Sequence, residues 1–151
     1  MIKHYSEIEW DDERWPNFSP GEPNLACPCC GMFCMDEDYF DAIQNARTIL
    51  GVPITINSGH RCAARNAHKD VGGAPNSEHL RIAFDVDIPE QRTPFQVFCA
   101  LWVSGFRSFG LYYGRIHADK RCRKFWTVGN YRKTWSREDE AVIKQTIRNG
   151  R

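Results

Sequence analysis

Residues 77–85 read SEHLRIAFD, a stretch in which a loop ending near His79 leads into a predicted strand. From Ile82 to Ile88, apolar side chains alternate with other residues, and this period of two is typical of a β-strand. Asp85 lies on one face of that strand, opposite the face that carries Phe84. The stretch therefore predicts a strand with one apolar face and, beside His79, one face that carries carboxylates.

The elements predicted on either side of this strand follow from capping residues, helical spacing of apolar residues and alternation of β-branched or aromatic residues. Residues 1–31, rich in Pro, Gly and Asn, predict an irregular N-terminal arm. We therefore expect one domain, residues 1–151, of the α+β class, with a small antiparallel sheet flanked by helices. The predicted helices are 36–50, 63–69, 93–104 and 136–151, and the predicted strands are 52–57, 82–88, 109–113 and 115–119.

Composition and charge narrow the class of protein. With 42% hydrophobic residues in 151, the chain can bury a sizeable core, which argues against global disorder. The net charge of +1 by itself implies no polyanionic partner. Basic residues nevertheless gather between Arg115 and Arg137, opposed only by Asp119. This patch could attract an anionic polymer, and an ordinary solvated face explains it equally well.

Seven cysteines are many for this length, and the odd number leaves at least one unpaired within a monomer. A structural zinc site, a disulfide and packed thiols all remain open. A single compact cluster lacks the second C-x-x-C-like hook of a usual zinc site, so we favour a disulfide or a packed thiol. Cys62 or Cys122 could complete a site or a bridge. The clustered residues are Cys27, Cys29, Cys30 and Cys34.

His79 and Asp85 are of the residue types that bind zinc, and His117 in a later predicted strand offers a third ligand. Three protein ligands leave a fourth position open, which is the arrangement of a catalytic zinc site. The spacing alone is a modest signal, because a lone histidine on a strand is more often structural than metal-binding.

Three motifs resemble the zinc D-Ala-D-Ala carboxypeptidase family of metallopeptidases, most closely its small, phage endolysin-like branch. They are SGHRC at 58–62, VGGAPNSEHL at 71–80 and IHAD at 116–119, and they occur in the family's order. The resemblance implies a hedgehog/DD-peptidase-like fold and one catalytic zinc ion. It also implies that His79 matches the first zinc ligand and His117 the last.

The aspartate ligand departs from the family's pattern. The family usually places it seven residues after the histidine with a glycine between them, whereas Asp85 comes six residues after His79. The simplest account is loss of that glycine, so that Asp85 keeps the role of ligand. Asp87, on the same face of the predicted strand, is the fallback.

Arg61 matches the arginine of the family's S-G-x-R motif, which lies beside the substrate's carboxylate or scissile carbonyl. A guanidinium suits either task, because it can bind a carboxylate with two hydrogen bonds or stabilise an oxyanion. An ordinary salt bridge is the alternative. Ser77 is expected to contact the substrate, and His60 is a weaker candidate for a substrate contact or a base.

The general base is less clear, because the D-x-x-H or H-x-H motif of related enzymes is missing before His117. Asp119, two residues later on the same strand face, is the candidate that would accept a proton from the attacking water. Its alternative role, equally weighted, is to orient a ligand histidine.

The resemblance implies a peptidase that hydrolyses D-amino-acid-containing bonds of peptidoglycan stem peptides. We expect the protein to be a monomer. The alternative is a non-catalytic, zinc-containing cell-wall-binding or virion module of the same fold. A zinc module that binds nucleic acid through the basic patch is weaker, because it leaves the motifs around His79 and Arg61 unexplained. We therefore expect no nucleic-acid partner.

The sequence also predicts where the protein acts. No apolar run approaches the roughly 20 residues that span a bilayer, so stable membrane insertion is not expected. The stretch Met1–Trp15 is polar and acidic and lacks the apolar segment of a signal peptide. We expect synthesis in the cytoplasm, followed by action at the cell wall or in the periplasm after release, or a place in a virion.

Overall fold

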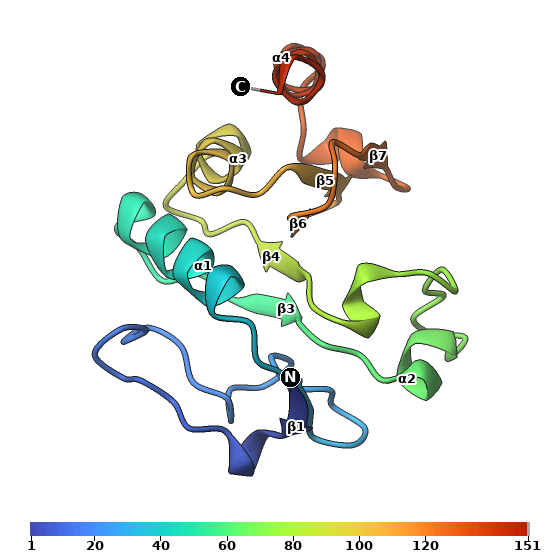
Figure 1. The fold of residues 1–151 in the computed structure, drawn as a ribbon. Coiled ribbons are helices and arrows are strands. Elements are labelled where there is room, and N and C mark those ends of the chain that lie inside the picture. The colour runs from blue at the N-terminus through green and yellow to red at the C-terminus, as the bar shows by residue number, and fades with distance from the viewer. Residues whose placement is uncertain (151) are drawn as a thin grey trace.

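The computed structural model describes residues 1–150, and Figure 1 shows a central sheet with α1 and α3 along one side and α2 toward the other. The N-terminal arm lies at one end of the molecule and α4 at the other. The helices are α1 (Glu37–Leu50), α2 (Ala63–Ala67), α3 (Pro94–Val103) and α4 (Arg137–Asn149). Three 3-10 turns are η1 (Tyr5–Glu7), η2 (Glu78–Leu80) and η3 (Tyr131–Lys133). The strands are β1 (Ile2–His4), β2 (Met32–Cys34), β3 (Ile56–Ser58), β4 (Phe84–Asp87), β5 (Ser108–Tyr112), β6 (Arg115–Asp119) and β7 (Phe125–Thr127).

The longer helices begin where their capping residues predict. The side chain of Asp36 accepts a hydrogen bond from the backbone of α1, and Gly51 ends that helix in the left-handed conformation, with φ of 68°. Thr93 and Gln96 form a reciprocal capping box at the start of α3. Ser136 caps α4 through its hydroxyl. These helix starts follow from local chemistry alone.

The central sheet has the strand order β3-β4-β6-β5-β7. The first four strands pair antiparallel, whereas β7 pairs parallel with β5. The predicted α+β class is confirmed, but the central sheet is mixed rather than wholly antiparallel. A purely antiparallel sheet is the small β1–β2 pair, which places a strand in the arm predicted to be irregular. Both departures involve three-residue strands, which are too short to show a period of two.

The alternation of β4 and β6 sets the two faces of the sheet. Phe84 pairs with Ala118 and Val86 with Ile116, and these side chains are buried in the core. The next positions point to the opposite face, because successive side chains of a strand alternate. The core also includes residues of the arm, namely Trp15, Phe18 and Leu25, so the arm packs as part of the same hydrophobic cluster.

None of the helices within residues 1–150 combines the length and the apolar character needed to cross a bilayer.

Candidate metal centre and substrate pocket

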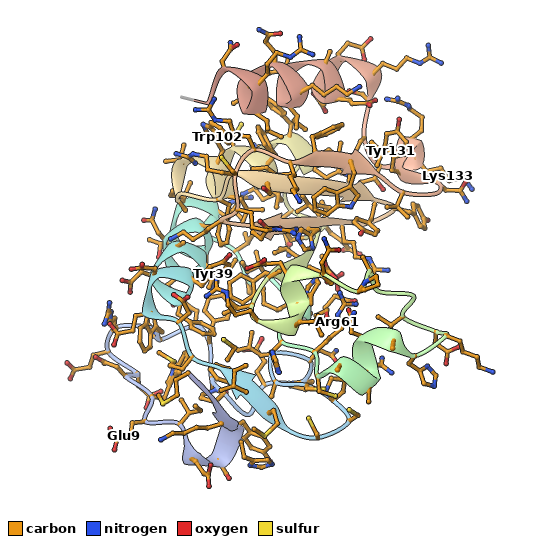
Figure 2. The ribbon with its side chains drawn as sticks, turned by 45° about the vertical axis from the view of Figure 1, so that its right-hand side comes forward. Glu9, Tyr39, Arg61, Trp102, Tyr131 and Lys133 are labelled. Carbon is orange, nitrogen blue, oxygen red and sulfur yellow. The ribbon has the colours of Figure 1, made fainter. Side chains whose placement is uncertain are left out.

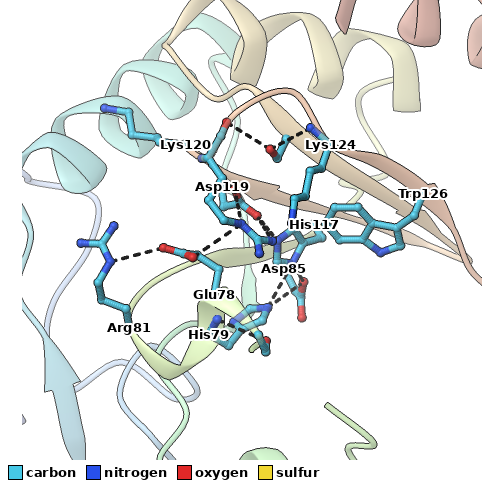
Figure 3. Close-up of polar contacts among 12 residues, drawn as sticks. Glu78, His79, Arg81, Asp85, His117, Asp119, Lys120, Lys124 and Trp126 are labelled. Atoms are coloured by element: carbon cyan, nitrogen blue, oxygen red, sulfur yellow. Dashed lines mark hydrogen bonds and ion pairs between the residues drawn. The ribbon is translucent and has the colours of Figure 1, made fainter. Parts of the chain in front are cut away.

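His79, Asp85 and His117 come from three elements and meet on the face of the sheet opposite the core. His79 lies on η2, while Asp85 on β4 is the direct cross-strand partner of His117 on β6. Figure 3 shows the three side chains converging. His79 Nε2 lies 3.1 Å from His117 Nδ1, and Asp85 Oδ1 lies 3.3 Å from the first nitrogen and 3.0 Å from the second.

The outer hydrogen bonds of the two rings fix their tautomers. His79 Nδ1 lies 2.7 Å from the carbonyl of Gly59 and must donate to it, so in a neutral ring Nε2 carries a lone pair. His117 Nε2 donates to Asp119 Oδ2 over 2.8 Å, which leaves a lone pair on Nδ1. Two lone pairs and a carboxylate oxygen then face one another. This donor set of two imidazole nitrogens and one carboxylate oxygen fits zinc.

The electrostatics of the group agree with a site for positive charge. Burial alone would raise the pKa of Asp85, but the neighbouring His79 and His117 outweigh it and hold that pKa well below its usual range. Burial lowers the pKa of His117, and the carboxylates of Asp119 and Asp85 more than compensate, so that the pKa is raised. The space between the three side chains therefore favours a cation, whether a proton or a metal ion.

Asp119 is fully buried and both of its oxygens accept hydrogen bonds. Oδ2 accepts from His117 and, over 2.8 Å, from Nη2 of Arg121, while Oδ1 accepts from the backbone N and Nε of Arg121 over 2.9 and 3.1 Å. Burial acts to raise the pKa of Asp119, but the bonds from His117 and Arg121 bring it well below the usual range. Its carboxylate is thus held behind His117, and Asp119 is not among the residues that line the neighbouring pocket.

A pocket of about 560 Å³ opens over His79, Asp85 and His117. Its charged lining is mainly basic, with two carboxylates, Asp70 and Asp85, against five cations. Such a pocket attracts anionic ligands. Part of the basic patch predicted between residues 115 and 137 therefore lies in the same pocket as His79, Asp85 and His117. The five cations are Arg61, Arg65, Arg115, Arg121 and Lys124.

Arg61 lies in the pocket wall beside η2 and α2, as Figure 2 shows. Its backbone N donates to the carbonyl of His79 over 2.7 Å, and its Nη2 donates to Ser77 Oγ over 3.4 Å. Its Nε is buried and finds no hydrogen-bond partner within residues 1–150. Burial lowers the pKa of Arg61, with Asp85 acting in the other direction. The buried Nε is therefore an unsatisfied donor, while other atoms of Arg61 line the pocket.

Two other candidates lie outside the converging group. His60 is buried, its Nδ1 donates to the carbonyl of Arg81 over 2.8 Å, and it does not line the pocket. Burial lowers the pKa of His60. Asp87, the fallback ligand, pairs across the strands with Arg115, one step of the same face away from the Asp85–His117 pair.

Trp126 and Tyr112 line the pocket, and sequence reasoning missed both. The Trp126 ring lies 4.9 Å from the His117 ring, and it reaches there across Gly110. A Cβ at Gly110 would lie 2.5 Å from the Trp126 ring, so only glycine fits at that position. A glycine inside an otherwise apolar strand was the one signal of this close approach.

A family model described as Peptidase M15 matches residues 17–119. The chain belongs to the peptidase M15 family. The predicted membership in the zinc D-Ala-D-Ala carboxypeptidase family is confirmed, and it supports a zinc-dependent peptidase. The matched range contains His79, Asp85 and His117, which could bind a metal ion. No curated protein and no solved structure matches the chain.

Proposed function

We propose that this M15 protein is a zinc metallopeptidase that hydrolyses D-amino-acid-containing peptide bonds of peptidoglycan. In this proposal His79, Asp85 and His117 bind one zinc ion. The observation that carries the proposal is the convergence of two imidazole lone pairs and one carboxylate oxygen at an open, basic pocket. A zinc ion bound there would polarise the scissile carbonyl and lower the pKa of an attacking water.

Asp119, in our proposal, orients His117 rather than accepting a proton from the substrate side. Both of its oxygens are already engaged, and the carboxylate is buried behind the histidine. A carboxylate that accepts the outer N–H of a ligand histidine fixes the tautomer and orientation of the ring. This leaves Asp70 and Asp85 as the only carboxylates that line the pocket within residues 1–150.

Arg61 is the proposed substrate-binding residue, with Ser77 beside it. The position of the Arg61 guanidinium in the pocket wall suits a carboxylate or a developing oxyanion of the substrate. We propose a structural role for His60, because its ring holds the carbonyl of Arg81 and lies away from the pocket.

The substrate class follows from charge as well as from family. Peptidoglycan stem peptides carry free carboxylates, and a pocket with five cations and two carboxylates attracts them. Because every proposed site residue comes from one chain, a monomer suffices for the activity. The resemblance to endolysins supports a role in cell-wall lysis or remodelling of the phage or prophage type.

The proposal is tested by measuring new amino groups released from purified peptidoglycan. We expect release by the wild type, loss of release in His117→Ala and after chelation, and recovery of the chelated wild type when zinc returns. His4→Ala is the matched control, because His4 does not line the pocket. Mass spectrometry of the fragments then identifies the bond.

A second candidate function is a non-catalytic, zinc-containing cell-wall-binding or virion module of the same fold. The small number of carboxylates in the pocket favours it, because within residues 1–150 only Asp70 lines the pocket besides the proposed ligand Asp85. The absence of release by zinc-loaded, folded protein on several wall types would refute the peptidase and leave this module.

A further inference from the structure

Four cysteines meet where the N-terminal arm touches the segment that follows β3. Their sulfur atoms all lie within 4.8 Å of one another. The Sγ atom of Cys29 is 3.5 Å from that of Cys27 and 3.1 Å from that of Cys62. Cys30 completes the group, whereas Cys34, which the sequence placed in the cluster, is buried on β2 and does not belong to it. Cys62 supplies a fourth sulfur from outside the compact cluster of cysteines in the sequence.

The spacing of the sulfur atoms fits a shared metal ion better than the two alternatives. In a tetrahedral site with zinc–sulfur bonds of about 2.3 Å, the sulfurs lie about 3.8 Å apart. A disulfide brings two sulfurs to about 2.05 Å and leaves the other two unexplained. All seven cysteines are free in the structure. Packing of thiols in the core does not explain the group either, because Cys29 and Cys30 are exposed.

The backbone around the sulfurs suits thiolates. Cys27 and Cys30 lie on a tight turn that Gly31 closes with φ of 70°, and the amide N of Gly31 donates to the carbonyl of Cys27 over 2.8 Å. The amide N of Cys62 donates to the sulfur of Cys27 over 3.4 Å, and the amide N of Arg65 donates to the sulfur of Cys62 over the same distance. Amide donors aimed at sulfur stabilise its negative charge.

We propose that Cys27, Cys29, Cys30 and Cys62 bind a second zinc ion through four thiolates. Four protein ligands close the coordination sphere, so this ion is structural and takes no part in hydrolysis. The inference does not depend on the proposed peptidase activity, because none of these cysteines belongs to the His79, Asp85 and His117 group.

A metal ion at this site would connect the arm, which carries three of the cysteines, to the loop that carries Arg61 and Cys62. Gly59 N donates to the carbonyl of Asn24 over 2.8 Å, and a Cβ at Gly59 would lie 2.4 Å from the carbonyl oxygen of Leu25. The arm and the loop are therefore in direct backbone contact beside the cysteines. The same loop holds His79 through the carbonyl of Gly59. A metal ion at the cysteines thus stabilises the backbone that orients a residue of the substrate pocket.

Metal content and thiol chemistry test the proposal without an activity assay. We expect two zinc ions per chain in the wild type, one in His117→Ala, and one in a Cys29→Ser, Cys62→Ser double variant. Cys122→Ser is the matched control and should keep two, because Cys122 is exposed and outside the group. An organomercurial that attacks thiolates should release the remaining zinc of His117→Ala completely.

A second measurement covers the case in which the cysteine variants fail to fold. Wild-type protein reconstituted with Co²⁺ should show a near-ultraviolet charge-transfer band from thiolate to cobalt, which nitrogen and oxygen ligands do not give. A folded wild type without that band, or one in which native mass spectrometry finds a disulfide among these cysteines and no metal, would overturn the proposal. A band in protein that does not cleave peptidoglycan would refute only the proposed peptidase.

Discussion

Replacing Asp119 with Asn tests whether this carboxylate orients His117 or serves as the base. The amide keeps the shape of the side chain and can still accept the bond from His117, but it loses the charge that strengthens that bond. Loss of such an outer partner typically costs 10–100-fold in metal affinity, or about 1.4–2.7 kcal/mol. We therefore expect zinc affinity at the His117 site to fall by that factor, with kcat near the wild-type value at saturating zinc.

The effect on folding is expected to be moderate. Removing one partner of a buried ion pair costs about 3–5 kcal/mol when the other charge is left buried. The Arg121 side chain is 26% exposed and retains Glu78 at 3.5 Å, so its charge keeps water and a partner. We therefore expect Asp119→Ala to lower the free energy of unfolding by about 1–3 kcal/mol. Asp119→Asn should lose less, and urea denaturation measures both.

Competition with a fluorescent zinc chelator gives the affinity, and a zinc titration of stem-peptide cleavage gives kcat. Glu78→Gln is the matched control, because it removes a carboxylate beside Arg121 that makes no hydrogen bond to His117. Its zinc affinity should stay at the wild-type value. A general base contributes about 10²–10⁴ to the rate. An Asp119→Asn protein with unchanged zinc affinity and a kcat lowered by that factor would refute the orienting role.

Three further predictions follow from the pocket, the sheet and the arm. Arg61→Gln should raise KM about 10–100-fold for peptides with a free C-terminal carboxylate, since a charge-assisted hydrogen bond contributes about 1.5–3 kcal/mol. If the wild type had equal KM values for peptides that end in a carboxylate and in an amide, that contact would be contradicted. Gly110→Ala should lower the free energy of unfolding by about 1–3 kcal/mol, because its Cβ would lie 2.5 Å from an indole ring. Gly21→Ala, whose Cβ would meet nothing closer than 3.7 Å, is its control in urea denaturation. Hydrogen bonding from Arg14 lowers the pKa of Asp41 in the folded protein. The pair therefore stabilises the fold at pH values above about 3.9, the pKa of an aspartate in the unfolded chain. That stabilisation is lost as the pH falls through the lower pKa of the folded state. The unfolding free energies of wild type and Asp41→Asn should therefore differ at neutral pH and converge below about pH 4; a difference that persists at lower pH would contradict the assignment.

The helices and the longer strands could be predicted because their signals are local. Asp36, Thr93 and Ser136 cap helices through hydrogen bonds within the next few residues. The two strands β5 and β6 likewise follow from residues next to one another and from the turn at Gly114, which has φ of 73°. Such elements depend little on the rest of the chain, so the sequence near them suffices.

The elements that were missed depend on partners far along the chain. Strands β1 and β7 contain three residues each, and each is defined by pairing with β2 or β5. Trp126 therefore reaches His117 through a parallel pairing that no local pattern reveals. Cys62 was one of two cysteines that could complete the cluster, but it is 35 residues from Cys27, so its membership depends on how the arm packs against the loop. Only the folded arrangement brings these side chains to their sites.

The position of the proposed aspartate ligand, Asp85, shows why sheet register carries more information here than spacing along the chain. His79 lies on a 3-10 turn outside the sheet, so its distance in sequence from β4 can change by one residue without moving the strand. Asp85 is fixed opposite His117 by the pairing of β4 with β6, whereas Asp87 is fixed opposite Arg115. Two residues along a strand correspond to about 6.6 Å, while a carboxylate oxygen binds zinc at about 2.0–2.2 Å. In our proposal, an ion held by His117 would therefore lie within reach of Asp85 and beyond that of Asp87, so the strand register favours Asp85 as the ligand.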